Sequence, residues 1–143
     1  MSRLVAELRS VLGPEGCLSR PEELFAYECD GLTLHTARPS AVAFPRSREE
    51  VQAVVRACRA HGVPFVPRGA GTGLSGGAIA LDGGVVIECS RMNRILALDP
   101  VDRFAVVEPG VVNQELSRQA APHGLFFRPD PSSQLDCTIG GNV

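Results

Sequence analysis

Hydrophobic side chains recur with the period of an α-helix near the start of the chain. Between residues 3 and 12, one helical stripe collects Leu4, Val5, Leu8, Val11 and Leu12. Gly13 and Pro14 follow directly, and this pair ends a helix because proline cannot continue its hydrogen-bond ladder. The pattern predicts an amphipathic helix over 3–12 that packs its apolar stripe against a core.

A second helical pattern covers residues 48–61 and lies between two apolar runs, 41–45 and 64–67. Its apolar face consists of Val51, Val54, Val55 and Cys58. Ser47 and Glu50 have the spacing of a capping box at its start, and Gly62 suits its C-terminal end. Since the two flanking runs are typical of strands, the three elements predict a βαβ unit.

Shorter patterns complete the predicted fold. Residues 85–89 predict a strand, and residues 95–98 and 104–108 predict an antiparallel hairpin around the turn 99–103. Short helices are expected over 21–27 and from a cap at Asn113 to Ala121. Together these elements predict a mixed α/β domain of the α+β class, in a chain whose 143 residues suffice for one domain.

Composition narrows the possible functions. The net charge is −2 and all fourteen basic residues are arginine, which excludes a lysine nucleophile and gives no basic patch for nucleic acid or membrane surfaces. Five scattered cysteines without C-x-x-C spacing argue against zinc or iron–sulfur sites and indicate free thiols in a cytoplasmic protein. We expect no signal peptide and no membrane span, because no apolar run is long enough.

The segment from Pro67 to Gly77 carries the candidate chemistry. Five of its eleven residues are glycine, and it follows the predicted strand 64–67. Such a loop can turn several backbone N–H groups toward one anion, which suits a phosphate or pyrophosphate. Arg68 at its start can add a fixed positive charge. The ends of strands in α/β sheets are the usual place for such ligands.

Two alternative motifs overlap in this loop. Residues 71–76 match the Rossmann fingerprint G-x-G-x-x-G, and residues 73–77 match G-x-S-x-G, the hydrolase elbow in which Ser75 is the nucleophile. Both motifs require a helix directly afterwards, whereas residues 77–84 are short and rich in glycine. A serine hydrolase remains an alternative that would require a histidine base near Ser75. The Walker loop is excluded because the chain has no lysine.

Several segments, in their order along the chain, resemble a known family. They are Arg38 to Pro45, Pro67 to Gly77, Glu108-Pro109-Gly110-Val111, Asp130-Pro131-Ser132-Ser133 and Thr138-Ile139-Gly140-Gly141-Asn142. This order resembles the start of the FAD-binding domain of the FAD-linked oxidases, the family of vanillyl-alcohol oxidase and p-cresol methylhydroxylase. Within that family it is most similar to the FAD-binding subunits of glycolate oxidase and to FAD-linked D-lactate dehydrogenases.

The resemblance implies a set of cofactor-binding residues. The first loop would hold the FAD pyrophosphate with Gly69, Ala70, Gly71, Thr72, Gly73 and Ser75, beside Arg68. The second loop would contribute Pro131, Ser132, Ser133, Thr138, Gly140, Gly141 and Asn142, and Pro109 and Gly110 would lie near the adenosine. Some relatives attach the flavin to a histidine of the first loop. Thr72 stands at the comparable position here, so non-covalent FAD is expected.

The resemblance also implies the reaction and the organisation of the chain. A 2-hydroxy acid of the glycolate or D-lactate type would lose a hydride to the flavin, with electron-transfer subunits as possible partners. Catalytic residues are expected outside this stretch, and no metal is expected. Residues 1–37 are interpreted as a helix and irregular lead-in, and 38–143 as the N-terminal part of a truncated FAD-binding domain. A truncated non-catalytic piece is the alternative, and such a piece is expected to self-associate through an uncovered strand edge and apolar surface.

Overall fold

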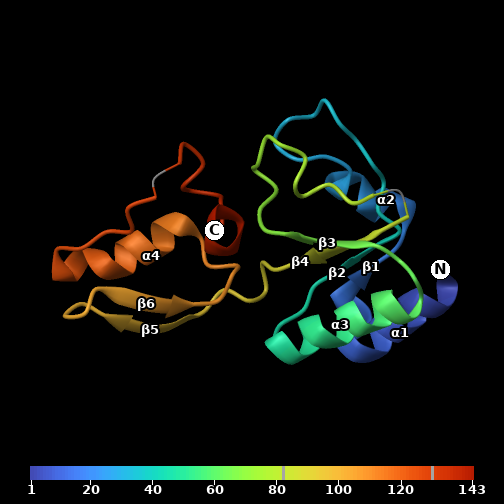
Figure 1. The fold of residues 1–143 in the computed structure, drawn as a ribbon, viewed down its shortest axis with the longest axis horizontal. Helices are drawn as coiled ribbons and strands as arrows, with labels where there is room; N and C mark the ends of the chain where they lie inside the picture. Colours follow the sequence, from blue (N-terminus) through green and yellow to red (C-terminus); the bar gives the residue numbers. More distant parts are fainter. Residues whose placement is uncertain (82, 130) are drawn as a thin grey trace.

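The computed structural model describes residues 1–81, 83–129 and 131–143, and it consists of two lobes that lie side by side (Figure 1). The first lobe contains α1 (Ser2–Leu12), η1 (Pro14–Gly16), β1 (Cys17–Leu18), α2 (Pro21–Leu24), η2 (Phe25–Tyr27), β2 (Ala41–Ala43), α3 (Arg48–Ala60), β3 (Phe65–Arg68) and β4 (Val85–Glu88). The second contains β5 (Ile95–Asp99), β6 (Phe104–Val107), α4 (Asn113–Ala120) and η3 (Ala121–His123). The single turn α5 (Ile139–Asn142) lies between the lobes.

The sheet of the first lobe has the strand order β1-β2-β4-β3. Strands β2 and β3 each run parallel to β4, with Val42 and Val66 both opposite Val86, while β1 pairs antiparallel with β2. The predicted βαβ unit is therefore present, and β4 is inserted between its two strands. This central position suits the apolar run Val85-Val86-Ile87, because the sheet is covered on both faces, with Val85 and Ile87 packed on one and Val86 on the other. The α+β fold class is confirmed.

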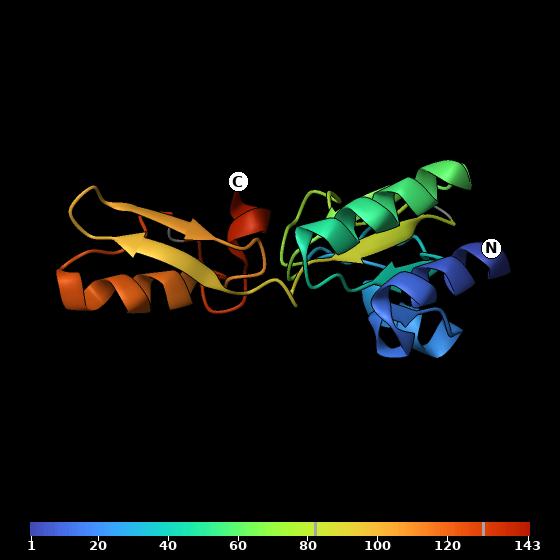
Figure 2. The same cartoon turned by 90° about the horizontal axis from the view of Figure 1, so that it is seen from below.

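Helices α1 and α3 cover one face of this sheet (Figure 2). Leu4 and Leu8 of α1 and Val54 of α3 pack there with the odd-numbered strand residues, among them Val85 and Ile87. The even-numbered residues point to the other face, where they pack with Leu24, Tyr27, Phe44 and Ala80. Because successive side chains of a strand point to opposite faces, each residue of β3 and β4 belongs to one face, and Arg68 and Glu88 lie on the second.

In the second lobe, helix α4 packs on one face of the β5–β6 hairpin. Its core consists of Val111, Leu116 and Ile139, against which Ile95, Ala105, Val107 and Phe127 pack. The outer face of the hairpin is apolar and exposed, with Leu96 at 56%, Phe104 at 50% and Val106 at 47% of their full accessibility. The hairpin and the helices predicted over 3–12, 21–27, 48–61 and 113–121 are thus present within a residue or two of the expected ends.

Three local predictions were wrong in detail. The carboxylate of Glu50 accepts from the backbone N–H of Arg46 at 2.7 Å rather than from that of Ser47, although the Ser47 hydroxyl does accept from the Glu50 N–H at 3.2 Å. Asn113 does not cap α4: Val112 precedes the helix, and the buried Asn113 amide donates to the carbonyl of Pro129 at 2.8 Å. Val11 is exposed, so the part of the predicted stripe that packs in the core consists of Leu4 and Leu8 with Val5 and Leu12 against them.

Candidate functional site

The glycine-rich loop follows β3 at the C-terminal edge of the parallel strands and faces the second glycine-bearing segment. A cavity of about 480 Å³ lies between the two segments. Thirteen predicted site residues line it: Arg68, Gly69, Ala70, Gly71, Thr72, Gly73, Ser75, Pro109, Ser133, Thr138, Gly140, Gly141 and Asn142. Gly110, Pro131 and Ser132 are not among the residues that line it. The fold therefore gathers most of the predicted site at the junction of the two lobes.

The two segments make their closest approach where Gly69 meets Thr138. A Cβ added to Gly69 would lie 2.3 Å from Thr138 Oγ1, so only glycine allows this approach. The strand-like pairing of residues 111–113 with 137–139 places Thr138, with the Ile139 N–H donating to the Val111 carbonyl at 2.8 Å. The buried hydroxyl of Thr138 has no hydrogen-bond partner among the described residues. An unpaired buried hydroxyl costs stability, which points to a ligand that accepts from it.

The backbone of the loop is open to an acceptor. Within the described part of the chain, the N–H groups of residues 69–75 donate no hydrogen bond. Gly71 and Gly76 have φ angles of 74° and 76°, a region that side chains disfavour, and these turns bend the loop around the cavity. Successive free amides at the end of a strand are the donors that the phosphate prediction requires.

Arg68 lines the cavity from beneath the loop and is itself buried. It is 8% exposed, its Nη1 donates to the carbonyl of Cys29 at 2.8 Å, and its guanidinium carbon lies 5.6 Å from the ring centroid of Tyr27. A Cβ added to Gly71 would lie 2.1 Å from Arg68 Nη2, so the guanidinium directly supports the loop. In this position its charge attracts an anion through the loop, because the low local dielectric screens it weakly.

A buried carboxylate accompanies Arg68. Glu88 is its partner in the β3–β4 register and accepts hydrogen bonds from the N–H and hydroxyl of Ser90. Burial raises the pKa of Glu88, while the bonds from Ser90 and the charges of Arg68 and Arg91 act in the opposite direction. Arg68 and Glu88 thus lie side by side beneath the loop. Both belong to strands of the sheet, β3 and β4, and not to the loop itself.

The remaining predicted residues differ in what they contact. The Gly140 N–H donates to the carbonyl of Pro109 at 2.8 Å, and a Cβ on Gly140 would lie 2.5 Å from Pro109 Cβ. Gly110 packs against the carbonyl of Cys89, which a Cβ would approach to 2.3 Å, and it lines a neighbouring hollow. Pro109 and Gly140 therefore form one wall of the cavity, and Gly110 lies behind that wall.

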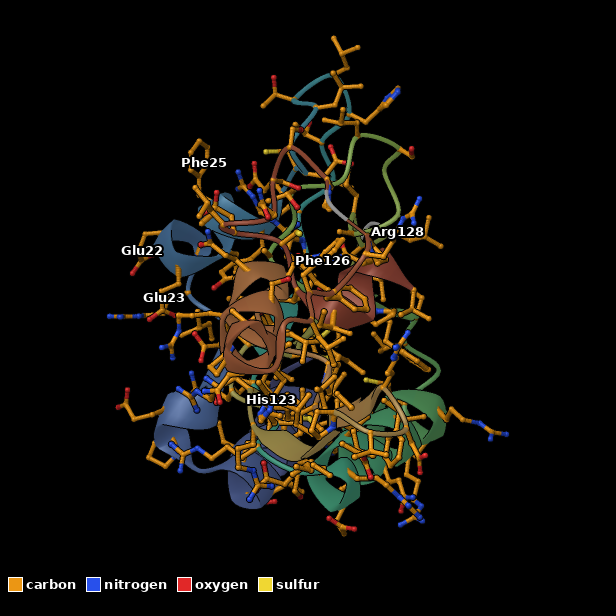
Figure 3. All side chains as sticks on the ribbon, turned by 90° about the vertical axis from the view of Figure 1, so that its left-hand side faces the viewer. Glu22, Glu23, Phe25, His123, Phe126 and Arg128 are labelled. Atoms are coloured by element: carbon orange, nitrogen blue, oxygen red, sulfur yellow. The ribbon has the colours of Figure 1, made fainter. Side chains whose placement is uncertain are left out.

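The geometry gives no support to a serine hydrolase. No helix follows the loop within residues 77–81 and 83–84. His61 pairs with Glu7, with Nε2 2.9 Å from Oε2, and His123 lies at the outer end of the second lobe (Figure 3). Neither of these nor His35, the third histidine, is among the residues that line the cavity, so Ser75 has no histidine base among those lining residues.

One residue that contacts the glycine loop was not predicted from the sequence. Asp30 of the lead-in is 6% exposed, and its Oδ2 accepts from the backbone N–H of Gly76 at 2.7 Å. The sequence signal was weak, because an Asp-Gly pair before an irregular stretch is typical of any turn. The contact depends on residues that are forty-six positions apart, so no local pattern reports it.

Taken together, the cavity fits the pyrophosphate of a dinucleotide. Free amides and an unpaired hydroxyl are donors, a buried guanidinium supplies positive charge, and the glycines leave room for close backbone approach. The described residues contain no group of three or more His, Cys, Asp or Glu side chains that would hold a metal ion. No helix in the same part of the chain is long and apolar enough to cross a membrane.

Comparison with known proteins agrees with this chemistry. The family model described as "FAD binding domain" matches residues 39–143. Glycolate oxidase subunit GlcD of Escherichia coli strain K12 is 50% identical over 126 residues, which are 88% of this chain and 25% of that protein. D-2-hydroxyglutarate dehydrogenase of Stutzerimonas stutzeri strain A1501 is 41% identical over 140 residues, 98% of this chain and 30% of that protein.

Among solved structures, p-cresol methylhydroxylase with bound substrate superposes with a TM-score of 0.76 at 28% identity, over 87% of this chain and 25% of that one. The fold predicted from the resemblance is thereby confirmed. The chain spans about a quarter to a third of the length of these proteins.

Proposed function

This chain belongs to the FAD binding domain family, and from that membership we propose that it is the cofactor-holding part of an oxidoreductase acting on a small 2-hydroxy acid. The substrates named in the relatives, glycolate and D-2-hydroxyglutarate, are both of this class. FAD would supply hydride acceptance when bound, and the chain would supply its binding and orientation.

The observation that carries the proposal is the meeting of two glycine-bearing segments at one cavity beside an unpaired hydroxyl. We assign the pyrophosphate to the free N–H groups of residues 69–73 and to the hydroxyl of Thr138. Ser75 and Ser133 line the same cavity and are assigned to neighbouring parts of the cofactor. Arg68 contributes its charge from beneath the loop.

The cofactor is proposed to be held without a covalent bond. A covalent link to the flavin needs a nucleophilic side chain on the loop, and the loop presents Thr72 where some relatives carry histidine. No histidine is among the residues that line the cavity. FAD released intact on acid precipitation would support this part of the proposal.

We assign no catalytic residue to this chain. The groups that bind the substrate carboxylate and remove the hydroxyl proton are proposed to lie in the part of a longer protein that this chain does not span. Electron-transfer subunits are proposed as partners, since one relative is named as a subunit of glycolate oxidase. The five free thiols support a cytoplasmic location, where cysteines stay reduced.

The experiment compares FAD, ADP and riboflavin. The purified chain is incubated with each, desalted or titrated calorimetrically, and its visible spectrum is recorded. We expect FAD and ADP to bind and riboflavin, which lacks the pyrophosphate, to bind far more weakly. Equal binding of riboflavin and FAD would contradict a grip on the pyrophosphate, and no binding of either FAD or ADP would refute the proposed function of the chain.

A further inference from the structure

The lead-in segment, residues 25–38, contacts the glycine loop directly although it precedes the family match at residue 39. It runs from η2 to β2 and crosses beside the loop on the face of the sheet that carries Tyr27 (Figure 1). Its contacts with the loop are concentrated at Asp30 and Gly31. These two residues define what we call the lead-in clamp.

Asp30 makes the first contact of the clamp. Its Oδ2 accepts from the Gly76 N–H at 2.7 Å, and its Oδ1 accepts from the Leu32 N–H at 2.9 Å. The carboxylate thus uses one oxygen to order its own turn and the other to hold the far end of the glycine loop. The hydrogen bond from Gly76 is the main cause of a lowered pKa of Asp30, so the carboxylate is ionised at neutral pH.

Gly31 makes the second contact. Its N–H donates to the carbonyl of Gly73 at 2.9 Å, and a Cβ added to Gly31 would lie 2.8 Å from the carbonyl oxygen of Thr72. The loop backbone therefore rests against a residue without a side chain. The Gly73 carbonyl oxygen is thus paired with the lead-in. This pairing matters because a carbonyl oxygen that faced the ligand would repel an anion.

Arg68 joins the same two segments from below. Its Nη1 donates to the carbonyls of Cys29 at 2.8 Å and of Ala78 at 3.4 Å. The residue before the clamp and the residue after the loop are thus tied to one buried guanidinium. The loop itself is held at Gly73 and Gly76, while the N–H groups of residues 69–75 donate no hydrogen bond among the described residues.

We propose that Asp30 and Gly31 are positioning residues that hold the glycine loop in the shape that binds the pyrophosphate. The inference rests on the proposed function, since the loop is taken to bind FAD. Neither residue touches the cavity, because neither is among the residues that line it. Each acts through the loop, by fixing the backbone before the ligand arrives, which lowers the ordering cost of binding.

The test uses Asp30→Ala, Asp30→Asn and Gly31→Ala, with Asp99→Ala as the matched control. Asp99 also accepts two backbone N–H bonds, from Val101 and Asp102 at 2.9 Å, but in the β5–β6 turn far from the cavity. The readouts are the FAD dissociation constant, the free energy of unfolding in urea, and amide exchange at residues 73–78 compared with β4.

We expect Asp30→Ala to weaken FAD binding about tenfold, as for a lost charge-assisted hydrogen bond. Its Gly76 amide should exchange faster while β4 amides keep their protection. Asp30→Asn keeps an acceptor without the charge and should recover part of the loss, to about threefold weakening. Gly31→Ala should weaken binding without any change of charge, and Asp99→Ala should leave the dissociation constant unchanged.

Unchanged binding in Asp30→Asn and Gly31→Ala, with folded proteins, would overturn the inference. So would equal weakening in Asp30→Ala and Asp99→Ala, since the effect would then be general destabilisation. If the unmodified chain binds no FAD, the proposed function fails by itself. Amide exchange then decides on the clamp: unchanged exchange of Gly76 in Asp30→Ala would overturn it, and faster exchange confined to the loop would support it.

Discussion

The substitution Thr138→Val removes one hydroxyl group and should change the free energy of unfolding and the FAD affinity in opposite directions. The Thr138 hydroxyl is buried and has no partner among the described residues, and a buried polar group without a partner costs about 1–3 kcal/mol. Valine keeps the shape and removes that cost. We therefore expect the free energy of unfolding without cofactor to rise by about 1 kcal/mol, and the melting temperature by roughly 4 °C.

The same substitution should weaken FAD binding. If the hydroxyl donates to a phosphate oxygen, valine removes a hydrogen bond to a charged group, worth about 1.5–3 kcal/mol. That corresponds to at least about tenfold in the dissociation constant. The two measurements thus change in opposite directions, which general damage to the fold does not produce.

The assay is urea unfolding without FAD, followed by titration of FAD monitored by flavin fluorescence. Thr138→Ser keeps the hydroxyl and should bind FAD within about twofold of the unmodified chain, as expected where the donor is retained. Thr36→Val, at an exposed position of the lead-in, controls for the exchange of threonine for valine. Wild-type FAD affinity in Thr138→Val would refute the role of the hydroxyl. A large loss of stability would show that the hydroxyl is already paired in the folded chain.

Three further predictions concern the pH dependence, the surface and the packing. The pKa of Glu115 is lowered to about 2 by hydrogen bonds from Arg118 and a neighbouring amide, so its stabilising effect is present above pH 4.5 and lost as the pH falls toward 2; urea midpoints between pH 2 and 6 should fall less steeply for Glu115→Gln. The exposed outer face of the hairpin should make the chain self-associate at high concentration, and light scattering should show a smaller mass for Val106→Glu, whereas a monomeric unmodified chain would contradict this. Gly140→Ala should weaken FAD binding because its Cβ would lie 3.0 Å from the backbone carbonyl oxygen of Pro109, and unaltered affinity would argue against that wall of the cavity.

The sequence predicted the elements whose signals are local. The stripe through Leu4 and Leu8 and the Ser47 cap each specify a helix by themselves, and α1 and α3 formed where expected. The cap at Asn113 failed because its side chain found a tertiary acceptor, the carbonyl of Pro129. Local capping rules do not include such competitors.

The site was predictable only in part, for the same reason. Glycine chemistry identified the loop at 69–77, whereas the second segment entered the prediction through resemblance to a family. The close approach of Gly69 to Thr138 and the bond from Gly76 to Asp30 join residues far apart in the chain. Such contacts follow from the packing of the two segments on the sheet, which periodicity does not encode.

The position of β4 has a consequence for how the chain is made. Its two parallel neighbours, β2 and β3, precede it in the sequence and do not pair with each other. A ribosome that has released only residues 1–84 has therefore produced two apolar strands whose shared partner is still missing. Val42 and Val66 can be sequestered only when Val86 emerges, so we expect the sheet to form late in synthesis and in one step. Until then helices α1 and α3 are complete, but the apolar side chains of β2 and β3 stay exposed. Exposed apolar surface of this kind is what chaperones bind.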